Sequence, residues 1–575
     1  MKRIVVLCVV FIMLFSMQIF AFNFPTPDWG ALLKEREKMV SETDFELYVE
    51  GSGKHSPYYG ARLEPKAGAY IGMVADTAPD FGKIGSYLTY IDSVGQTDLY
   101  YPSNKMIRED NVISTVAINI NSLNEVNYDT IRKTLDTLNS YNKPMIIRFA
   151  NEMNCSSLGD EPKRYVEIFR NVANMIHEYP NFAVVWSPND FGALDRDFSY
   201  YYPGDEYVDW VGVSCYPIKY FQNNPNQLAR DKVFFMTAEN SFTTNRLKPL
   251  LKFMQDNNIN KPVMISEGAV EVENSQNEPH ESWATPRIRN MLYNVIMKYP
   301  QVKLINYFNV YRKNEKVKFN ISDKPYASEI FKEAVSSGAY ITEAGGNADF
   351  VFEKAEYGEK IRAKDGIVNL YTLAHIPGLE SLTVNYSIDG KWYHSTSSSP
   401  YKCSLNVSQL SDGKHTLKIY SSGVEKEYVF YKKGMKDIKI AFGKMPQQER
   451  TSVTDIVSYI NGNAVTSFNY KDETYIVAED LLNYQIDVRW NGSERILYIE
   501  GINKNNPSVP SFSKVAEYLI EETDIRTYIK NPNTNEYEFI TSHNINGRTI
   551  IKFDELSRFG SVLWDGSART LSLGF

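Results

Sequence analysis

Short apolar runs alternate with longer amphipathic stretches from Ala69 to about Ser336. The apolar runs have the length of strands, and the stretches between them carry apolar residues at helical spacing, as at Tyr128–Tyr141 and Glu161–His177. This alternation predicts a (β/α)8 barrel, the TIM-barrel architecture. The predicted strands are Ala69–Val74, Asp98–Tyr101, Thr115–Asn119, Met145–Ala150, Ala183–Trp186, Val208–Ser214, Val263–Ser266 and Lys303–Phe308.

The pattern changes after a polar, glycine-containing linker at Glu343–Asn347. From about 349 to 435 the chain has short strand-like runs separated by turns. Leu382–Ile388 alternates apolar and polar residues and is followed by an Asp-Gly turn at Asp389. This stretch predicts an immunoglobulin-like β-sandwich.

The last part of the chain, residues 438–575, contains an internal repeat. Tyr475–Leu481 precedes Arg489–Arg495, and Ile550–Leu556 precedes Leu563–Arg569 in the same order. Each copy predicts a strand, a short helix and a hairpin, which together make an α+β repeat domain. The repeat resembles the domain family named after the N-terminal domain of copper amine oxidases, which implies a stalk on a secreted bacterial protein. We expect no copper, because His543 is the only histidine in this part of the chain.

The N-terminus has the pattern of a signal peptide. A charged start at Met1–Arg3 precedes an apolar stretch at Ile4–Phe20, and Ala21 is the predicted last residue removed. The apolar stretch is also long enough for an uncleaved membrane anchor, which remains an alternative. We therefore predict a signal peptide at 1–21, a barrel domain at 22–340, and a secreted, extracellular or surface-associated protein of a Gram-positive bacterium.

Length, net charge and cysteine content limit the number of domains and the possible partners. The 575 residues are too many for one core and predict several domains. A formal net charge of −8 argues against a nucleic-acid partner, which would need a basic face. After signal removal the remaining cysteines are Cys155, Cys215 and Cys403, too few for a disulfide framework, and we expect them to stay unpaired.

Two predicted strands end in carboxylates. Glu152 follows the fourth strand and Glu267 follows the seventh, and the strand ends of a parallel barrel meet on one face. A pair of carboxyl groups is what cleavage of a sugar bond needs: one protonates the leaving oxygen, and the other attacks the anomeric carbon or activates water. Strand alternation places Arg148 inside the barrel below Glu152, where it would need an acid partner such as Glu267, either as a structural ion pair or as part of the site.

Several stretches resemble glycoside hydrolase family 26 of clan A, which includes β-mannanases and related β-glycanases. They occur in the family's order and cover about residues 25–336. The matching stretches are Gly68–Gly72, Arg148–Asn154, Val185–Asn189, Tyr202–Gly212 and Ser266–Gly268.

This resemblance implies roles for individual residues. Glu152 would be the acid/base and Glu267 the nucleophile of a retaining mechanism, with the two carboxyl groups about 5–5.5 Å apart. Tyr216 would donate a hydrogen bond to the nucleophile. From its place at the end of the fifth strand, Trp186 would either stack on a sugar ring or pack in the core, and Tyr307 or Phe308, at the eighth strand, would form the floor of the central subsite.

The chain departs from the family at two places. Asn151 stands where the family has a histidine, and other clan A families use asparagine there to hold the substrate 2-hydroxyl. The loop at Cys155–Asp160 has no aromatic residue, whereas the family has an aromatic-rich loop that holds substrate. The expected substrate is therefore a β-mannan or a related β-glucan or xylan.

Two functions remain open from the sequence. The first is an endo-acting β-glycanase without cofactor, whose C-terminal modules contact the cell wall. The second is an inactive barrel that only binds polysaccharide at the cell surface. A metal-dependent hydrolase is disfavoured, because the stretch from Ala69 to Ser336 has only His177 and His280 and neither follows a strand.

Overall fold

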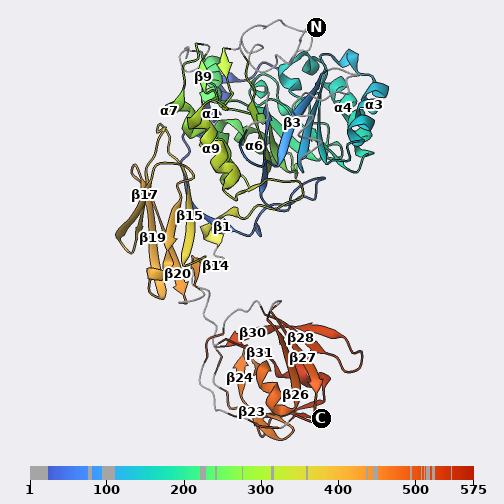
Figure 1. Ribbon diagram of the computed structural model, residues 1–575, viewed down its shortest axis with the longest axis vertical. Coiled ribbons are helices and arrows are strands. Elements are labelled where there is room, and N and C mark those ends of the chain that lie inside the picture. The colour runs from blue at the N-terminus through green and yellow to red at the C-terminus, as the bar shows by residue number, and fades with distance from the viewer. Residues whose placement is uncertain are drawn as a thin grey trace. The chain divides into compact units, whose positions relative to one another are not determined.

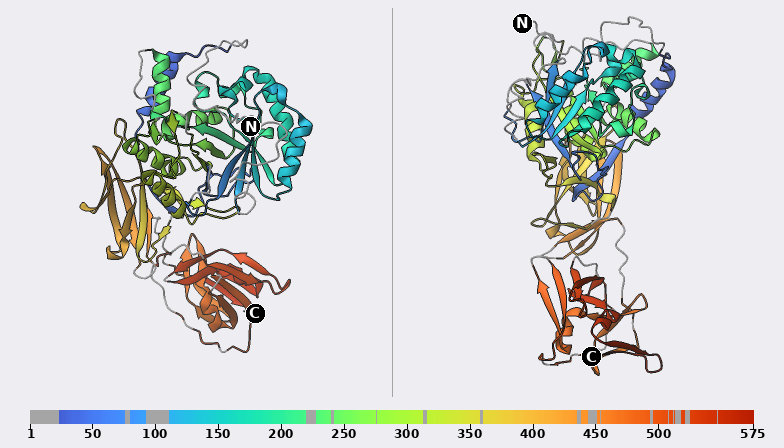
Figure 2. Two further views of the ribbon diagram at one scale, coloured as in Figure 1. Left: turned by 45° about the horizontal axis from the view of Figure 1, so that its top comes forward. Right: turned by 90° about the vertical axis from the view of Figure 1, so that its right-hand side faces the viewer.

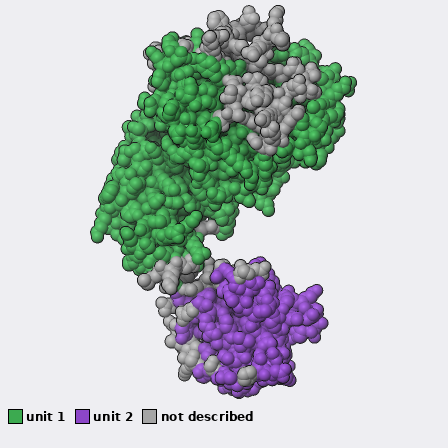
Figure 3. Space-filling view, viewed as in Figure 1, with its two compact units in different colours: residues 1–443 green, residues 444–575 purple. Residues whose placement is uncertain are grey.

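A computed structural model (Figure 1) describes most of the chain in two compact units, residues 1–443 and 444–575 (Figure 3). The predicted signal peptide and the strand predicted at Asp98–Tyr101 lie outside the described residues. No helix among the described residues is long and apolar enough to cross a membrane. The described residues are 24–75, 80–92, 111–219, 228–239, 242–274, 276–312, 316–357, 360–434, 438–443, 451–452, 454–492, 495–506, 508–510, 512, 518–520, 525–545 and 547–575.

Eight parallel strands of the first unit close into a barrel, as predicted. Each strand pairs with the next, and the last pairs with the first. A short strand, β12 (Tyr340–Ile341), adds to the first strand outside the closed ring. The barrel strands are β2 (Ala69–Ala75), β3 (Ser86–Asp92), β4 (Ile113–Asn119), β5 (Met145–Phe149), β6 (Phe182–Trp186), β7 (Trp210–Cys215), β8 (Val263–Gly268) and β10 (Val302–Asn309).

Helices surround the barrel (Figure 2), and the amphipathic ones face the strands with an apolar stripe. In α4 the buried residues include Tyr165, Phe169, Val172 and Ile176, which recur every three or four positions. The α-helices of the described residues are α1 (Trp29–Val40), α3 (Tyr128–Asn139), α4 (Pro162–His177), α5 (Ala229–Glu239), α6 (Lys248–Asp256), α7 (Glu281–Arg289), α8 (Val295–Lys298) and α9 (Pro325–Ser336). Shorter elements are η1 (Leu123–Glu125), η2 (Met153–Cys155), η3 (Ser157–Asp160), η4 (Gly192–Leu194), η5 (Phe198–Tyr200), η6 (Asp205–Tyr207), η8 (Phe242–Arg246), η9 (Asn290–Asn294), and the paired strands β9 (Glu273–Asn274) and β11 (Val317–Lys318).

The second barrel strand differs from the prediction. It is β3, which pairs with β2 and β4 and occupies the place assigned to Asp98–Tyr101. Ser86 and Thr89 interrupt its apolar run, although both are fully buried. A strand covered on both faces normally shows a continuous apolar run. Because Ser86 and Thr89 interrupt the apolar run, the sequence pattern did not predict this strand.

A β module follows the barrel within the first unit. Its two sheets have the orders β13-β1-β15-β18 and β14-β21-β20-β19-β16-β17, and residues of both sheets form one hydrophobic core. An immunoglobulin-like fold for this module stays a prediction. Its elements are β1 (Asp44–Gly51), β13 (Val351–Lys354), η10 (Ala355–Tyr357), β14 (Lys360–Arg362), β15 (Ile367–His375), β16 (Val384–Ile388), β17 (Lys391–Thr396), β18 (Cys403–Asn406), η11 (Val407–Gln409), β19 (Gly413–Ser421), β20 (Val424–Lys433) and β21 (Lys439–Phe442).

Strand β1 changes the predicted domain boundary at 22. This strand precedes the barrel in sequence, yet it pairs with β13 and β15 of the β module. The barrel is therefore inserted between β1 and the remaining strands of the module. Strand β21 also pairs within the β module, so this module extends past the predicted start of the third domain at 438.

The second unit is built from two halves with the same order of elements. Each half has a hairpin, a second hairpin, a short 3-10 helix and a third hairpin, which matches the internal repeat of the sequence. The first half is β22 (Val457–Ile460), β23 (Asn463–Val465), β24 (Ser467–Tyr470), β25 (Glu473–Val477), η12 (Ala478–Tyr484), β26 (Ile486–Asn491) and β27 (Ile496–Ile502). The second half is β28 (Arg526–Lys530), β29 (Tyr537–Ile540), β30 (Ser542–Ile545), β31 (Arg548–Lys552), η13 (Phe553–Arg558), β32 (Ser561–Asp565) and β33 (Thr570–Gly574).

The halves exchange their first hairpins. Strand β22 pairs with β33 of the other half, and β28 pairs with β27. The central strands β25 and β31 also pair with each other. Neither half can complete its sheets alone, so the repeat forms one folding unit. Its membership of the stalk family stays a prediction.

Candidate active site

Both predicted carboxylates lie at the same end of the barrel. Glu267 is the penultimate residue of β8, and Glu152 follows the end of β5 by three residues. Each is only 3% exposed. The strand ends of the barrel thus bring together two acids from distant parts of the sequence.

One guanidinium contacts both acids. Nη1 of Arg148 donates to Oε2 of Glu267 at 2.7 Å, and its Nη2 lies 3.7 Å from Oε1 of Glu152. Nε donates to the hydroxyl of Ser187 at 3.0 Å, and Nη2 donates to that of Ser214. Arg148 is fully buried, so these bonds fix its plane. The predicted pairing of Arg148 with Glu267 is present, and the arginine is part of the site.

Three donors converge on the carboxylate of Glu267. Besides Arg148, the hydroxyl of Tyr90 donates to Oε2 at 2.7 Å, and the hydroxyl of Tyr216 donates to Oε1. Burial, followed by the charge of Glu267, raises the pKa of both tyrosines well above the usual value, so both keep their protons. The resemblance implied the bond from Tyr216. Tyr90 was missed.

Glu152 has a different environment. Burial, followed by the negative charge of Glu267, raises its pKa to about 7, while Arg148 and bonds from Ser214 and Asn189 act in the opposite direction. Its Oε1 is buried without a hydrogen bond to a described residue. Glu152 therefore keeps its proton up to a higher pH than an ordinary glutamate, as a group that donates a proton must.

The backbone leading to Glu152 is strained. Ala150 has φ of 45° and Glu152 has φ of 55°, both in the left-handed region that residues with a Cβ avoid. The alternation of faces used to place Glu152 from the sequence ends at Phe149, where β5 ends. The tight turn, rather than strand alternation, directs Glu152 into the site.

Asn154 fastens this turn to its neighbour. Its Nδ2 donates to the carbonyl of Asn189 at 2.7 Å, and its Oδ1 accepts from the amide of Asn189 at 2.9 Å. Oδ1 of Asn189 in turn accepts from the amides of Phe191 and Gly192. The turn that contains Glu152 is thereby held against the loop after β6.

Asn151 lies half-buried beside the acids. Its Oδ1 is buried and has no hydrogen bond to a described residue. A buried amide oxygen without a partner is costly unless a ligand or water completes it. This state fits the predicted role of Asn151 in holding a substrate hydroxyl, which stays a prediction.

Trp186 does not line the site. It is fully buried and contacts Phe198, Tyr202 and Phe253 on the helix side of the barrel. Stacking on a sugar ring is excluded in this position, and the alternative of core packing holds. The physical reason is strand alternation: Val185 is in the interior cluster of the barrel, so Trp186 faces outward.

Tyr307 also faces away from the site, contrary to the prediction. It is fully buried against Phe331 of α9, and its hydroxyl donates to the carbonyl of Phe319. Asn306 and Phe308 face inward instead. The ring of Phe308 packs edge-on against Tyr216 at 6.0 Å between centroids. Of the two aromatic residues left open by the sequence, Phe308 is the one beside the acids.

Polar groups elsewhere have structural roles. Asp209 accepts from the amide of Val184 at 2.8 Å and contacts His177 at 2.9 Å, at the opposite end of the strands. Sγ of Cys155 donates to the carbonyl of Glu152 at 3.3 Å, and within the described residues neither Cys155 nor Cys215 is in a disulfide. Within the described ranges, the structure contains no group of three or more histidine, cysteine, aspartate or glutamate side chains arranged to hold a metal.

Residues 96–285 match the model of glycosyl hydrolase family 26. The barrel resembles this family. The matched segment contains Glu152 and Glu267, and it supports a glycoside hydrolase domain. A search of curated protein sequences gave no match.

Solved structures of family 26 enzymes are among those similar to this chain. A Cellulomonas fimi endo-β-1,4-mannanase double mutant is 13% identical, with a TM-score of 0.35, and the match covers 64% of this chain and 95% of that one. The Bacteroides ovatus family 26 β-mannanase BoMan26A is 15% identical, with a TM-score of 0.34, over 56% and 96% of the two chains.

The pKa of Glu152 predicts the alkaline limb of activity. An acid catalyst works only while protonated, so we expect kcat/KM to fall about tenfold per pH unit above about 7. A pH profile of polysaccharide hydrolysis measures this limb. Glu152→Gln should remove it and slow substrates with poor leaving groups far more than those with a dinitrophenolate leaving group. An unchanged limb in Glu152→Gln would assign it to another residue.

The position of Trp186 predicts a loss of stability without a loss of substrate affinity. We expect Trp186→Phe to lower the free energy of unfolding by about 1–3 kcal/mol, because it leaves a cavity against Phe198 and Phe253. KM should stay within about twofold of the wild type. Urea unfolding measures the loss of stability, and steady-state kinetics measures KM. A large rise in KM at unchanged stability would show that Trp186 contacts the substrate.

Proposed function

We propose that the barrel is a retaining, endo-acting β-glycanase that cleaves polysaccharide by double displacement. The observation behind this proposal is the single buried guanidinium of Arg148 that contacts both carboxylates. It orients Glu267 for attack, while Glu152, with its raised pKa, retains a proton for the leaving group.

The reaction follows from the orientation of Glu267 and the proton on Glu152. Glu267 attacks the anomeric carbon as Glu152 transfers its proton to the glycosidic oxygen, and the bond to the leaving sugar breaks. The glycosyl group is then bonded to Glu267. Water attacks the same carbon after giving its proton to Glu152, and the ester bond to Glu267 breaks. Both carboxyl groups return to their first state, and the configuration of the sugar is retained.

The substrate class rests on the family match and on polar groups around the acids. Asn151 presents an amide oxygen without a partner, which suits a sugar hydroxyl. The loop at η3 is fixed by Arg196, which donates to Ser156 and Asp160. It offers no aromatic ring to a sugar. We therefore propose a neutral β-linked polysaccharide, with β-mannan, β-glucan and xylan as the candidates to compare.

Trapping of the glycosyl-enzyme tests the proposal. A glycosyl fluoride with fluorine at C2 slows both steps, and the good leaving group lets the covalent intermediate accumulate. We expect mass spectrometry to find one sugar bonded to Glu267 in the wild type and none in Glu267→Ala. Label on another residue would refute the assignment of the nucleophile.

The second candidate is a barrel that binds polysaccharide without cleaving it. The aromatic-free loop at Cys155–Asp160 favours this alternative. Release of reducing ends from a polysaccharide panel separates the two functions. Ends released by the wild type and not by Glu267→Ala support the enzyme. Retention on the same polysaccharides without any release supports the binding protein.

We also propose that the protein is exported and acts outside a bacterial cell. The charged start at Met1–Arg3 and the apolar stretch at Ile4–Phe20 support this location. The immunoglobulin-like module and the stalk would then hold the barrel near the cell wall. Fractionation of the source cells tests the location.

A further inference from the structure

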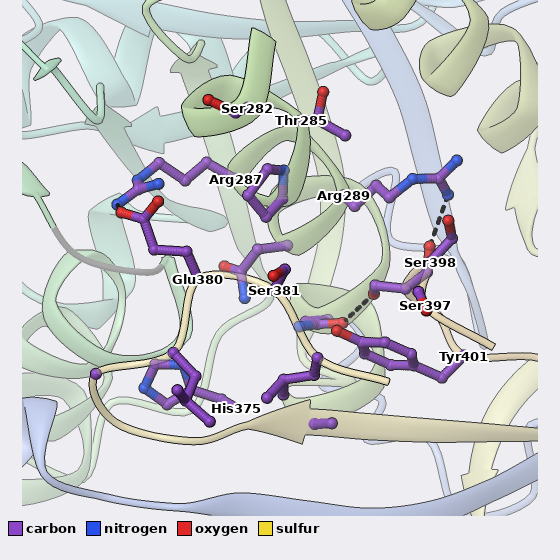
Figure 4. A pocket seen from close by; sticks show the side chains of 18 of the residues that line it. Ser282, Thr285, Arg287, Arg289, His375, Glu380, Ser381, Ser397, Ser398 and Tyr401 are labelled. Carbon is purple, nitrogen blue, oxygen red and sulfur yellow. Dashed lines mark hydrogen bonds and ion pairs between the residues drawn. The ribbon is translucent and has the colours of Figure 1, made fainter. Parts of the chain in front are cut away.

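A cleft of about 1040 Å³ separates the barrel from the β module within the first unit (Figure 4). Helix α7 and η9 form one wall. The loops between β15 and β16 and between β17 and β18 form the other. Its volume is at the upper end of the range for small-molecule sites. We call it the α7 cleft, and it is distinct from the barrel mouth that contains the two acids.

Polar contacts fix the distance between the two walls. Nη1 of Arg289 donates to the carbonyl of Ser399 at 2.6 Å, and the hydroxyl of Ser399 donates to Oδ1 of Asn294 at 2.8 Å. Arg287 and Glu380 form an ion pair of 3.5 Å across the cleft. The cleft is therefore a prearranged space, and binding in it requires little ordering of the walls.

The charges around the α7 cleft are mostly neutralised in pairs. Arg287 pairs with Glu380, and Arg289 pairs with Glu333 of α9 at 2.6 Å. The remaining acid of the lining, Glu281, is exposed to solvent. Apart from this solvent-exposed carboxylate, the charges of the described lining residues are paired, so the cleft has little charge to attract an ion. A neutral ligand therefore fits better than an ion.

Unpaired hydroxyl groups line both walls. On α7 these are Ser282 and Thr285, and on the facing loop it is Ser381, none of which has a side-chain hydrogen bond to another described residue. Nε2 of His375 is buried in the lining, also without such a bond. Hydroxyl groups both donate and accept, so they match a ligand with many hydroxyls of its own.

Apolar surface lies between these polar groups. The lining includes the ring of Phe235 and the side chain of Leu379, which is 43% exposed. A pyranose has polar edges and apolar faces and matches this mixture. We propose that the α7 cleft is a second, non-catalytic site for a neutral oligosaccharide, through which the protein holds its polysaccharide away from the acids.

Calorimetry on the full chain with Glu267→Gln, which cannot complete hydrolysis, tests the proposal. The probes are hexasaccharides of β-1,4-linked mannose, glucose and xylose. We expect two binding events with at least one of them. Ser381→Arg or Thr285→Arg, each of which fills the cleft from one wall, should weaken one event at least tenfold and leave the other unchanged. Gln409→Arg adds the same charge on an exposed part of the β module and should change neither.

The outcomes separate this inference from the proposed hydrolysis. A single event, or two events that neither cleft variant changes, overturns the second site even if the wild type cleaves polysaccharide. Two events that respond to the cleft variants support it even if the wild type releases no reducing ends. If none of the three hexasaccharides binds, the proposed second site is also overturned.

Discussion

Glu267→Ala is expected to lower kcat at least about 10⁴-fold, because a nucleophile and its partners act as one unit in such sites. The variant leaves Arg148, Tyr90 and Tyr216 facing an empty space of the size of a small anion. Azide added to the solution can occupy that space and attack the anomeric carbon from the same side as the lost carboxylate. We expect partial recovery of activity with activated substrates, and a glycosyl azide of inverted configuration.

The matched experiment uses the other acid. Glu152→Ala with azide and an activated substrate should give a glycosyl azide of retained configuration, because Glu267 still forms the covalent intermediate. Glu206→Ala, an exposed acid at the opposite end of the barrel strands, is the control and should keep full activity. Product configuration measured by NMR decides the outcome. The same configuration from both acid variants would contradict the assigned roles.

The sequence predicted the two acids because their chemistry and their position coincide. Each follows an apolar run that is a buried parallel strand, and such strands end on one face of a barrel. The alternation of faces along β5 also placed Arg148 correctly. The same rule, applied to β6, would have directed Trp186 outward, since Val185 before it is inside. This rule was not applied to Trp186, so stacking on a sugar and packing in the core both remained open from the sequence.

Other features could not be read from the sequence. Tyr90 lies on β3, whose apolar run is interrupted by Ser86 and Thr89, so the sequence did not predict this strand. Tyr90 was therefore not recognised as a donor to Glu267. The pairing of β1 with β15 joins residues more than three hundred positions apart, and nothing in the local pattern of Asp44–Gly51 indicates a partner beyond the barrel. Asn154 was part of a recognised motif, but its two bonds to Asn189 depend on a turn with positive φ that the local pattern does not specify.

Arg148→Met is the change that we expect to lower stability most. It leaves Glu267 and Glu152 buried beside each other without a cation, and loss of one partner of a buried pair costs about 3–5 kcal/mol. The variant should also lose most of its activity, because Glu267 is no longer oriented by Nη1.

A double-mutant cycle distinguishes this electrostatic cost from simple loss of packing. In Arg148→Met/Glu267→Gln the buried charge is absent, so the combined loss in free energy of unfolding should be smaller than the sum of the single losses by about 2 kcal/mol.

The loss of stability caused by Arg148→Met should also depend on pH. The charge of Arg148 lowers the pKa of Glu152, so without it this pKa rises further above the unfolded value, and the contribution of Glu152 to stability is intact at low pH and is lost as pH rises. Urea unfolding should therefore show a smaller deficit for Arg148→Met at pH 5 than at pH 8. Additive losses that do not change with pH would mean that Arg148 fills space and does not hold the acids.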